Sequence, residues 1–374
     1  MKVAVLGTRG IPARYGGFET FAEELATRLA RRGHEVTVYC RSKNYPYTER
    51  SHQGVKLIVL PTLRQKYLDT VVHTFLSILH SLFRDFDVLL VCNAANSPFC
   101  FLPRLFGKKV LLNVDGIERE RRKWGLPGKA WYRMAEFLST LLPNGIITDA
   151  RVIRDYYLER YKKESFMIPY GAKTERAPST RFLKRFGLEE DGYFLYVSRL
   201  EPENNADLVV RAFEGLETDK KLVIVGDAPY ARDYKRRLME TRDPRILFTG
   251  YVFGEGYLEL QSHAFCYVHA TEVGGTHPAL LEGMGLGRCV IVNGTPENTE
   301  VAGEGALLYR KNDVDDLRRR LSWLLRHPEA REHFAGEARA RVSQFYSWDR
   351  VADQYEELFR SVLKRSANSN VSEG

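Results

Sequence analysis

The chain has 374 residues, of which 44% are hydrophobic and 28% are charged, a composition typical of globular proteins. Its length predicts two domains, because one core rarely serves more than about 250–300 residues. No apolar run reaches the roughly 18 residues of a transmembrane helix, and the short first run enters a glycine-rich turn, which predicts a strand rather than a signal peptide. The five scattered cysteines contain no CxxC pair, which indicates reduced core residues of a cytosolic protein.

The net charge of +8 predicts an anionic partner, which would be a nucleic acid, a membrane surface or a substrate. The sequence has no zinc-finger, RNP or basic-helix signature, so a nucleic acid is the least favoured of the three. The expected partners are therefore an anionic substrate and an anionic membrane surface.

The first residues predict a βαβ unit. Residues 1–6 form the first strand, a glycine-bearing loop runs to Gly17, and the second strand covers residues 34–40. This loop lies at the carboxyl end of the first strand, the usual ligand edge of a parallel sheet. It lacks the GxGxxG spacing, and no ribose-binding acid ends the second strand, which disfavours a nicotinamide enzyme.

Residues 63–83 predict a helix that is apolar nearly all round. The preferred interpretation is a helix packed in the core. The alternative is a helix that also meets lipid, because Arg64, Lys66 and Arg84 lie at its ends.

Two further strands, at residues 87–92 and 109–114, each lead into a polar loop. Asn93 and Asn96 follow the first strand, and Asp115 follows the second. These loops fall at the same strand ends as the glycine loop, so three polar loops converge on one edge and predict a binding site.

Residues 119–133 interleave six basic residues with aromatic ones. One interpretation is a solvated helix face that carries a few aromatics. The other is a lip that binds an anionic interfacial acceptor, because Trp and Tyr favour the headgroup layer. The second interpretation places Arg119, Lys123 and Trp124 against the acceptor.

A polar, proline-bearing stretch at residues 173–181 indicates a domain boundary. We expect an N-terminal domain at 1–175 and a C-terminal domain at 176–346. Both halves alternate strands and helices, which predicts two parallel, doubly wound sheets. A last helix is expected at 347–365, followed by a disordered polar tail at 366–374.

The main site signal follows a short strand at residues 264–269. Gly274 and Gly275 let the backbone approach a ligand closely. Thr276 suits a helix cap and Pro278 a helix start, so the next helix would direct its N–H groups toward a phosphate.

Glu282 lies one turn inside that helix, where its carboxylate can accept from a hydroxyl of the same ligand. A phosphate site beside such a carboxylate predicts a nucleotide-sugar site. The alternative is a βα connection in which the glycines only pack.

Together these motifs resemble the retaining GT-B glycosyltransferases of family four. The opening Gly7-Thr-Arg-Gly-Ile-Pro-Ala-Arg-Tyr-Gly-Gly-Phe-Glu19 resembles a bacterial branch, the rhamnosyltransferases of capsule, O-antigen and cell-wall polysaccharide assembly. The resemblance covers nearly the whole chain. The other agreeing stretches are Asn93–Asn96, Asn113–Gly116, Arg199–Asn205 and Gly274–Glu282.

The resemblance implies an α/β protein of GT-B architecture, with two Rossmann-like domains facing across a cleft and the last helix crossing back to the first domain. The C-terminal domain would bind the nucleotide sugar and the N-terminal domain the acceptor. Arg199 would neutralise the diphosphate, and Glu282 would hold a ribose-type hydroxyl. Gly16 and Gly17 would let the N-terminal loop close over the diphosphate. The remaining donor contacts would come from Thr276, His277, Pro278 and Ala279.

The chain departs from the family pattern at three positions. Gly274 stands where the family has the first of two glutamates, with Glu272 as a nearby substitute. Asn204 replaces a lysine, and Asp115 replaces a histidine. These changes affect how the sugar and diphosphate are held. A deoxy sugar such as rhamnose, with one hydroxyl fewer, would fit the lost glutamate.

The expected reaction transfers a sugar, best assigned as L-rhamnose from dTDP-rhamnose, with retention onto a lipid-linked or saccharide acceptor. Arg199 and a helix N-terminus would stabilise the leaving diphosphate by preorganised electrostatics, so we expect neither a metal nor a cofactor. Asp115 would orient the acceptor or merely shape a turn. The alternatives are a UDP- or GDP-hexose donor, a nucleotide-sugar epimerase and a non-catalytic sugar- or lipid-binding module. The expected location is the cytoplasmic face of the membrane, with peripheral attachment.

Overall fold

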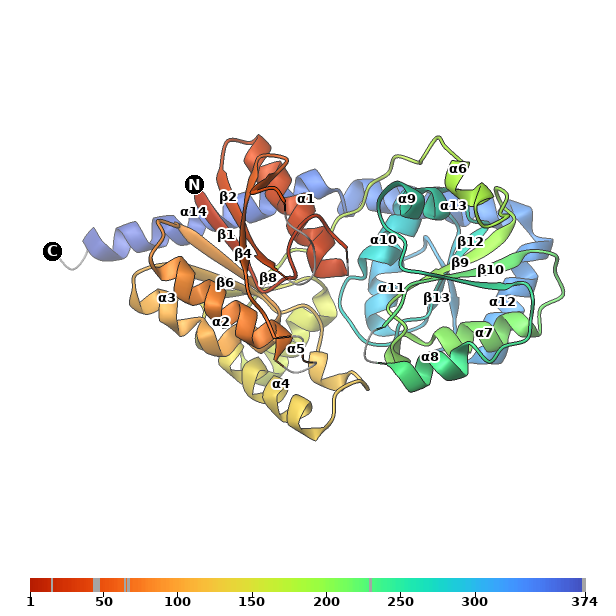
Figure 1. Cartoon of the computed structure of the whole chain (residues 1–374), viewed down its shortest axis with the longest axis horizontal. Coiled ribbons are helices and arrows are strands. Elements are labelled where there is room, and N and C mark those ends of the chain that lie inside the picture. Colours follow the sequence, from red (N-terminus) through yellow and green to blue (C-terminus); the bar gives the residue numbers. More distant parts are fainter. Residues whose placement is uncertain (15, 43–47, 64, 66–67, 229–230, 372–374) are drawn as a thin grey trace. The chain divides into compact units, whose positions relative to one another are not determined.

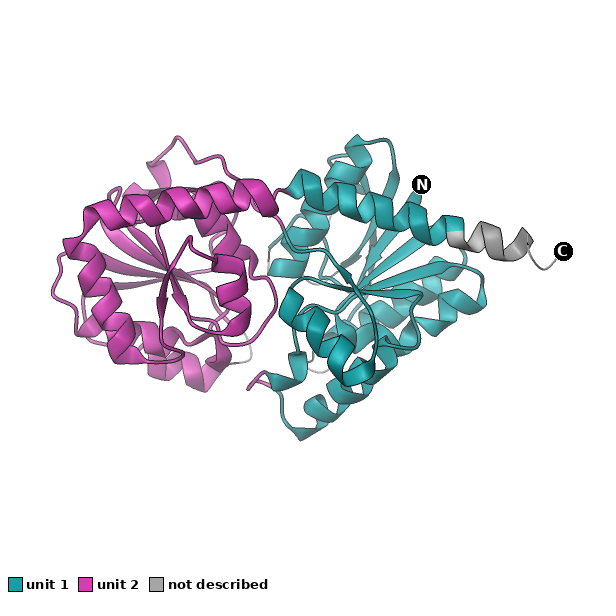
Figure 2. Cartoon of the chain, turned by 180° about the vertical axis from the view of Figure 1, so that it is seen from behind, with its two compact units in different colours: residues 1–120, 124–170, 348–374 teal, residues 121–123, 171–347 magenta. Residues whose placement is uncertain are grey.

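The structure is a computed structural model that describes residues 1–14, 16–42, 48–63, 65, 68–228 and 231–371, with side chains to residue 364. The chain separates into two compact units (Figure 2). Unit 1 contains residues 1–120, 124–170 and the segment from Trp348 onward, and unit 2 contains residues 121–123 and 171–347. The division falls between Tyr170 and Gly171, five residues before the expected boundary.

Unit 1 is built on an eight-stranded sheet with the order β3-β4-β2-β1-β5-β6-β7-β8 (Figure 1). All neighbouring strands are parallel except β3 and β4. The strands are β1 (Lys2–Leu6), β2 (Glu35–Arg41), β3 (Ser51–His52), β4 (Val55–Leu60), β5 (Val88–Cys92), β6 (Lys109–Asn113), β7 (Gly145–Thr148) and β8 (Phe166–Met167). The central strands are buried on both faces, which explains their continuous apolar sequences.

The helices of unit 1 cover this sheet. They are α1 (Gly17–Arg31), α2 (Asp69–Leu82), α3 (Phe101–Leu105), α4 (Leu126–Ser139), α5 (Arg151–Tyr161) and α14 (Trp348–Val371), with the 3₁₀ helices η1 (Ala94–Phe99) and η2 (Glu118–Glu120). α2 is less buried than the preferred interpretation of a core helix implies, because Phe75 is exposed and five further apolar side chains are only half-buried. Arg64 and Lys66, which were expected to flank it, lie outside the described residues.

Unit 2 is built on a six-stranded sheet with the order β11-β10-β9-β12-β13-β14, in which every pairing is parallel. Its strands are β9 (Tyr193–Val197), β10 (Lys221–Val225), β11 (Ile246–Gly250), β12 (Cys266–His269), β13 (Val290–Asn293) and β14 (Leu307–Tyr309). Its helices are α6 (Arg181–Lys184), η3 (Pro202–Asn204), α7 (Ala206–Glu214), α8 (Arg232–Leu238), α9 (Gly254–His263), α10 (Pro278–Gly285), α11 (Pro296–Ala302), α12 (Val314–Arg326) and α13 (Pro328–Phe345). The prediction of two parallel, doubly wound sheets is confirmed.

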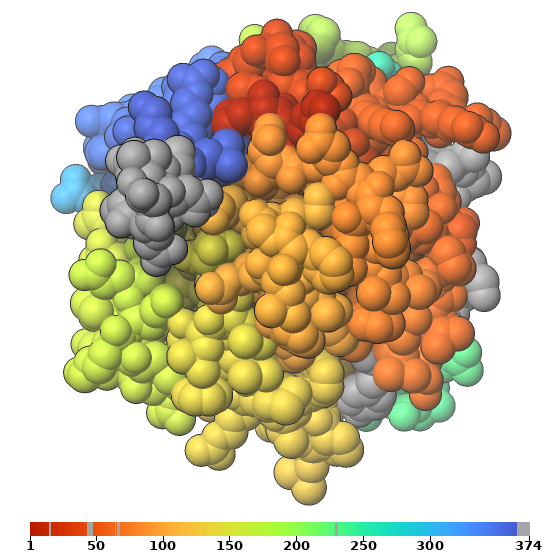
Figure 3. All heavy atoms as spheres, turned by 90° about the vertical axis from the view of Figure 1, so that its left-hand side faces the viewer, coloured from red at the N-terminus to blue at the C-terminus, as the bar shows by residue number. Residues whose placement is uncertain are grey.

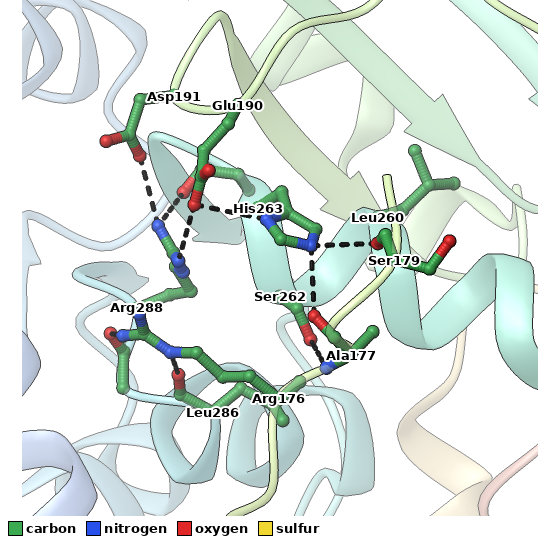
Figure 4. Close-up of polar contacts among 12 residues, drawn as sticks. Arg176, Ala177, Ser179, Glu190, Asp191, Leu260, Ser262, His263, Leu286 and Arg288 are labelled. Atoms are coloured by element: carbon green, nitrogen blue, oxygen red, sulfur yellow. Dashed lines mark hydrogen bonds and ion pairs between the residues drawn. The ribbon is translucent and has the colours of Figure 1, made fainter. Parts of the chain in front are cut away.

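The first segment of unit 2 is fixed to the body of that unit by a polar network (Figure 4). The guanidinium of Arg176 donates to the carbonyl of Leu286 at 2.6 Å. The buried Arg288 forms an ion pair with Asp191 at 3.0 Å, and His263 lies 3.1 Å from Glu190. The stretch that was expected to mark a domain boundary is therefore an ordered part of unit 2.

The last helix, α14, belongs to unit 1, as predicted for a helix that crosses back. The ring of Tyr355 packs 5.3 Å from that of Phe21 on α1, and Arg28 of α1 forms an ion pair with Asp349 at 2.9 Å. α14 continues to Val371, beyond the expected end at 365, because no glycine or proline interrupts it. Residues 372–374 of the expected tail lie outside the described residues.

Candidate active site

In unit 2, the carboxyl ends of β9 and β12 lie side by side at the centre of the sheet. The strand order changes direction between these two strands, and ligands of open α/β sheets bind at such a point. The loop after β9 carries Arg199, and the loop after β12 carries Glu272 to Pro278. The backbone N–H of Glu272 donates to the carbonyl of Glu203 at 2.9 Å, which joins the two loops.

The position of Arg199 depends on a glycine of the neighbouring strand end. Gly226 follows β10 with φ of +135°, and a β-carbon there would lie only 1.8 Å from the carbonyl oxygen of Ser198. Glycine is therefore required for the two strand ends to approach each other.

The sequence predicts that Asn204 contacts the donor, and the structure shows that it also orders its own loop. It is buried, and its side-chain amide donates to the carbonyl of Arg199 at 2.7 Å. The shorter Asn side chain turns back to its own loop, whereas a lysine would extend outward. Asn204 therefore positions Arg199.

His277 lies in a positively charged environment formed by two arginines. Its pKa is held well below 6.5 by burial and by the nearby His269, Arg121 and Arg199. The imidazole is consequently neutral at physiological pH, and the positive charge of this part of unit 2 resides on the guanidinium groups. A concentration of fixed positive charge at a helix start favours an anion.

The helix α10 begins at Pro278, but its N-cap is His277 and not the expected Thr276. The difference follows from Pro278, which is the first helical residue and makes its predecessor the cap. The buried Thr276, the half-buried Pro278 and Ala279 and the glycines of the loop all lie at this helix end.

The side chain of His277 occupies the space beside Gly274. A β-carbon at Gly274 would lie 2.2 Å from Cε1 of His277, so the imidazole occupies the space that a side chain at position 274 would need. The ring of His277 also packs 4.8 Å from that of His269. This packing gives a physical reason for the missing glutamate at position 274.

Glu282 lies one turn inside α10 and accepts a hydrogen bond from the hydroxyl of Tyr257 on α9. Gln261, one turn further along α9, donates to the same hydroxyl at 3.0 Å. Burial and the adjacent Glu282 raise the pKa of Tyr257 well above its usual value. Tyr257 therefore remains a neutral donor that orients Glu282. Tyr257 and Gln261 are four residues apart on α9 and therefore lie on one face of that helix.

Glu272 is held by two cations. Its carboxylate lies 2.5 Å from the guanidinium of Arg122 and 3.8 Å from the ammonium of Lys311. Residues 121–123 belong to unit 2, so this is an internal contact of that unit. The carboxylate thus has a fixed position in the loop that precedes Gly274.

An asparagine network beneath the site was not identified from the sequence. The carbonyl of Ala270 accepts from Asn205 at 3.0 Å and from Asn293 at 3.1 Å. Asn298 donates to the carbonyl of Thr271 at 2.9 Å. These buried amides fix the end of β12 and therefore the start of the loop that carries Glu272.

In unit 1, the loops after β1, β5 and β6 meet at one sheet edge. Gly7 has φ of +90°, and a β-carbon there would lie 2.3 Å from the carbonyl of Cys92. The buried Asn96 donates to that same carbonyl at 2.7 Å, and Asn93 caps η1 through the N–H of Ala95. Both asparagines therefore help to order the loop, and their contact with the acceptor stays a prediction.

Three more predicted residues lie near this edge. Asp115 has a left-handed backbone, with φ of +57°, and its N–H donates to the side chain of Asn113 at 3.1 Å. Gly16 caps α1 with extended backbone, and Gly17 is the first residue of that helix. Tyr15, which directly precedes Gly16, lies outside the described residues.

The aromatic rings of the basic-aromatic stretch 119–133 are half-buried or buried. Arg119 is bound to the buried Glu136 at 3.0 Å, and Trp124 packs 5.2 Å from the buried Tyr132. Arg121 is also buried, while Lys123 is half-buried. Arg122, Lys129 and Arg133 are exposed, so the basic residues of this stretch divide between inward and outward positions, which periodicity could not reveal.

The described residues contain no group of three or more His, Cys, Asp or Glu side chains placed to hold a metal ion. None of the helices within these ranges is long and apolar enough to cross a bilayer. All five cysteines are buried, as predicted.

Comparison with known proteins places the two halves in related families. Residues 15–176 match the description Glycosyltransferase Family 4, and residues 180–341 match Glycosyl transferases group 1. The chain is 28% identical to the O-antigen chain mannosyltransferase B of Escherichia coli, over 46% of each protein. It is 25% identical to the GDP-mannose-dependent alpha-(1-6)-phosphatidylinositol monomannoside mannosyltransferase of Mycolicibacterium smegmatis, over 87% of this chain and 89% of that protein.

Two solved structures share the fold. Sucrose-phosphate synthase from Thermosynechococcus elongatus superposes with a TM-score of 0.84 at 17% identity, over 97% of this chain and 99% of that one. Anabaena HepE, solved with UDP and glucose, superposes with a TM-score of 0.80 at 16% identity, over 96% and 100%. The fold and these matches define a retaining glycosyltransferase of the GT-B class. The chain belongs to glycosyltransferase family 4.

Proposed function

We propose that this protein transfers a sugar from a nucleoside diphosphate to an acceptor hydroxyl, with retention at the anomeric carbon. The observation that carries the proposal is the grouping of Arg121 and Arg199 around His277 at the start of α10, with Glu282 one turn further on. The two guanidinium groups suit the diphosphate, and Glu282 suits a hydroxyl of the nucleoside.

The chemical demand of this reaction is the negative charge that develops on the leaving diphosphate. The bond from the anomeric carbon to the diphosphate oxygen breaks, and a bond to the acceptor oxygen forms on the same face. The acceptor proton passes to the leaving phosphate. Fixed positive charge at Arg121 and Arg199 lowers the barrier by preorganised electrostatics, so the proposed reaction needs no metal ion. Because His277 is neutral, it contributes hydrogen bonding and shape, not charge.

The proposed donor is dTDP-L-rhamnose. The packing of His277 against Gly274 removes one carboxylate from the family's sugar site, and a 6-deoxy sugar has one hydroxyl fewer to bind. The mannosyltransferase names of the relatives make GDP-mannose the main competitor, with UDP-hexoses next. The proposed acceptor is a lipid-linked or saccharide hydroxyl of a bacterial surface polysaccharide, oriented by Asp115 in unit 1. The protein would act at the cytoplasmic face of the membrane, attached peripherally.

A thermal-shift panel of nucleotide sugars tests the donor. A true donor at one hundred times its dissociation constant adds about 2.7 kcal/mol to the free energy of unfolding. We expect the dTDP-rhamnose shift to exceed those of GDP-mannose and UDP-glucose. A product formed without any acceptor would instead indicate an epimerase, and binding without turnover would indicate a sugar-binding module.

Glu282 and Glu272 should differ in the ligand part that they contact. A hydrogen bond to a charged group contributes about 1.5–3 kcal/mol. Glu282→Gln should therefore weaken the binding of both the nucleoside diphosphate and the whole donor by roughly tenfold to a hundredfold. Glu272→Ala should spare the nucleoside diphosphate and reduce turnover of the whole donor. Titration calorimetry and turnover assays on both variants separate the roles.

Lys311→Ala is the control for the Glu272 test, because it removes the more distant cation and leaves Arg122 on Glu272. It should resemble the wild type in both measurements. Equal losses for both ligands in Glu272→Ala would show that Glu272 only shapes the loop.

A further inference from the structure

The helix α2 has an inverted distribution of polar and apolar residues. Its buried side carries Asp69, His73, Thr74, Ser77, Ile78 and Ser81. Most of these are polar, and their bonds are made inside the unit: Asp69 pairs with Arg41 at 2.7 Å, and His73 lies 3.1 Å from the carbonyl of Cys40. The remaining side of this helix is mostly apolar and partly exposed, with Phe75 exposed among half-buried valines and leucines, which is the reverse of an ordinary surface helix.

The apolar surface continues over α3 and α4. Near the C-terminal ends of these three helices, the exposed large apolar side chains are Phe83 (87%), Leu105 (74%), Phe106 (64%), Leu141 (56%) and Phe137 (51%). We call this set the α2–α4 apolar face. Figure 3 shows the side of unit 1 on which α2 and α3, in orange, adjoin α4, in yellow.

Hydrogen bonds hold the three helix ends together. The guanidinium of Arg104, next to Leu105, donates to the carbonyl of Leu142 at 2.6 Å. The ammonium of Lys108 donates to the carbonyl of Arg84, next to Phe83, at 2.5 Å. The exposed apolar residues at the ends of α2, α3 and α4 therefore form one patch and not isolated side chains. Contiguous apolar patches of this kind mark interaction sites.

The charges on these helices favour a negatively charged partner. Within α2, α3 and α4 the acidic residues are Asp69 and Glu136, and both are buried in ion pairs. The exposed charged residues of the same helices are Arg104, Lys129 and Arg133, all basic. The exposed Asp85, just beyond α2, is paired with Lys2 at 2.6 Å. Two copies of this surface would repel each other, whereas an anionic surface would attract it.

We propose that the α2–α4 apolar face docks on an anionic bilayer surface, with its aromatic and leucine side chains in the interfacial layer and its basic residues toward the headgroups. This deepens the proposed function, on which it rests for the lipid-linked acceptor. It takes Lys129 and Arg133 from the basic-aromatic stretch 119–133, whose two tryptophans are half-buried, and adds the exposed apolar residues at the ends of α2, α3 and α4.

The test uses the full chain and vesicles of phosphatidylcholine, with or without phosphatidylglycerol. Combined Phe83→Ser, Leu105→Ser and Phe106→Ser should weaken sedimentation with the phosphatidylglycerol vesicles by roughly tenfold or more, because interfacial binding scales with buried apolar area. The matched control is Met239→Ser with Phe345→Ser, two exposed apolar residues of unit 2 (53% and 43%). This control should bind as the wild type does.

The charge component is tested by Lys129→Glu with Arg133→Glu on α4. Each basic residue near an anionic leaflet contributes about a factor of five to binding. The affinity of this double variant for phosphatidylglycerol vesicles should therefore fall by roughly tenfold or more, whereas its affinity for vesicles of phosphatidylcholine alone should change little. Lys184→Glu with Arg237→Glu, at exposed positions of unit 2, makes the same change in net charge and should have little effect.

Three outcomes would overturn the proposal: no vesicle binding by the wild type, equal losses in the test and control variants, or a dimeric wild type that the serine variant makes monomeric while vesicle binding is unchanged. The last result, from light scattering after gel filtration, would identify a second copy as the partner. Donor binding is measured on the same variants by thermal shift. If no nucleotide sugar stabilises even the wild type, the proposed function fails, but the docking result still stands by itself.

Discussion

Arg199→Ala should lower kcat by roughly 10²–10³-fold at saturating donor, because removal of one preorganised group that stabilises developing negative charge has an effect of this size. The loss should appear in kcat more than in donor affinity, since the charge on the diphosphate grows as the bond breaks. Rapid-quench measurement of single turnovers, beside equilibrium binding of the nucleoside diphosphate, checks both quantities.

Two further variants make the Arg199 test specific. Arg199→Lys keeps the charge but loses the planar pair of donors, so it should recover only part of the activity. Arg211→Ala removes an exposed arginine of the same unit, paired with Asp207 at 3.1 Å, and should leave kcat unchanged. Full activity in Arg199→Ala would remove Arg199 from the proposed mechanism.

Gly226→Ala should be the most damaging small substitution in unit 2. The left-handed backbone adds roughly 1–3 kcal/mol of strain, and the contact with the carbonyl of Ser198 adds about 1–3 kcal/mol more. We expect the free energy of unfolding in urea to fall by about 2–6 kcal/mol. Because the contact lies next to Arg199, the folded fraction should also bind nucleoside diphosphate more weakly.

Gly254→Ala is the matched control for this glycine. Gly254 also has a positive φ, of +63°, but a β-carbon there would meet no atom within 4 Å. Gly254→Ala should lower the free energy of unfolding by only about 1–2 kcal/mol and leave ligand binding intact. If the two variants were equally stable, the close approach of the strand ends at Gly226 would not matter in solution.

The order of elements could be predicted because local signals agree with the fold. The strands are apolar runs of buried parallel sheets, and Pro278 marks the start of α10 by its chemistry alone. The sequence also indicated Arg199 and Glu282, since each falls at a strand end or a helix start. Such positions are set by neighbours in the chain.

Long-range contacts explain what the sequence could not show. The sequence did not show that the side-chain amide of Asn204 donates to the backbone carbonyl of Arg199. The role of Tyr257 in orienting Glu282 depends on the packing of α9 against α10. The outward apolar side of α2 depends on Arg41 and Cys40, which supply polar partners from a strand far away in the sequence. No local pattern records such pairings.

The attachment of α14 to unit 1 has a consequence for synthesis on the ribosome. Asp349 and Tyr355 lie more than 320 residues after the α1 residues that they contact, and unit 2 is encoded almost entirely between them. Domains usually fold as units, the N-terminal one first, as they emerge. Here the first unit to emerge cannot be completed until the last helix leaves the exit tunnel. Unit 2 can therefore reach its native state earlier, and a nascent chain stalled before residue 348 would leave exposed the side of α1 that packs against α14.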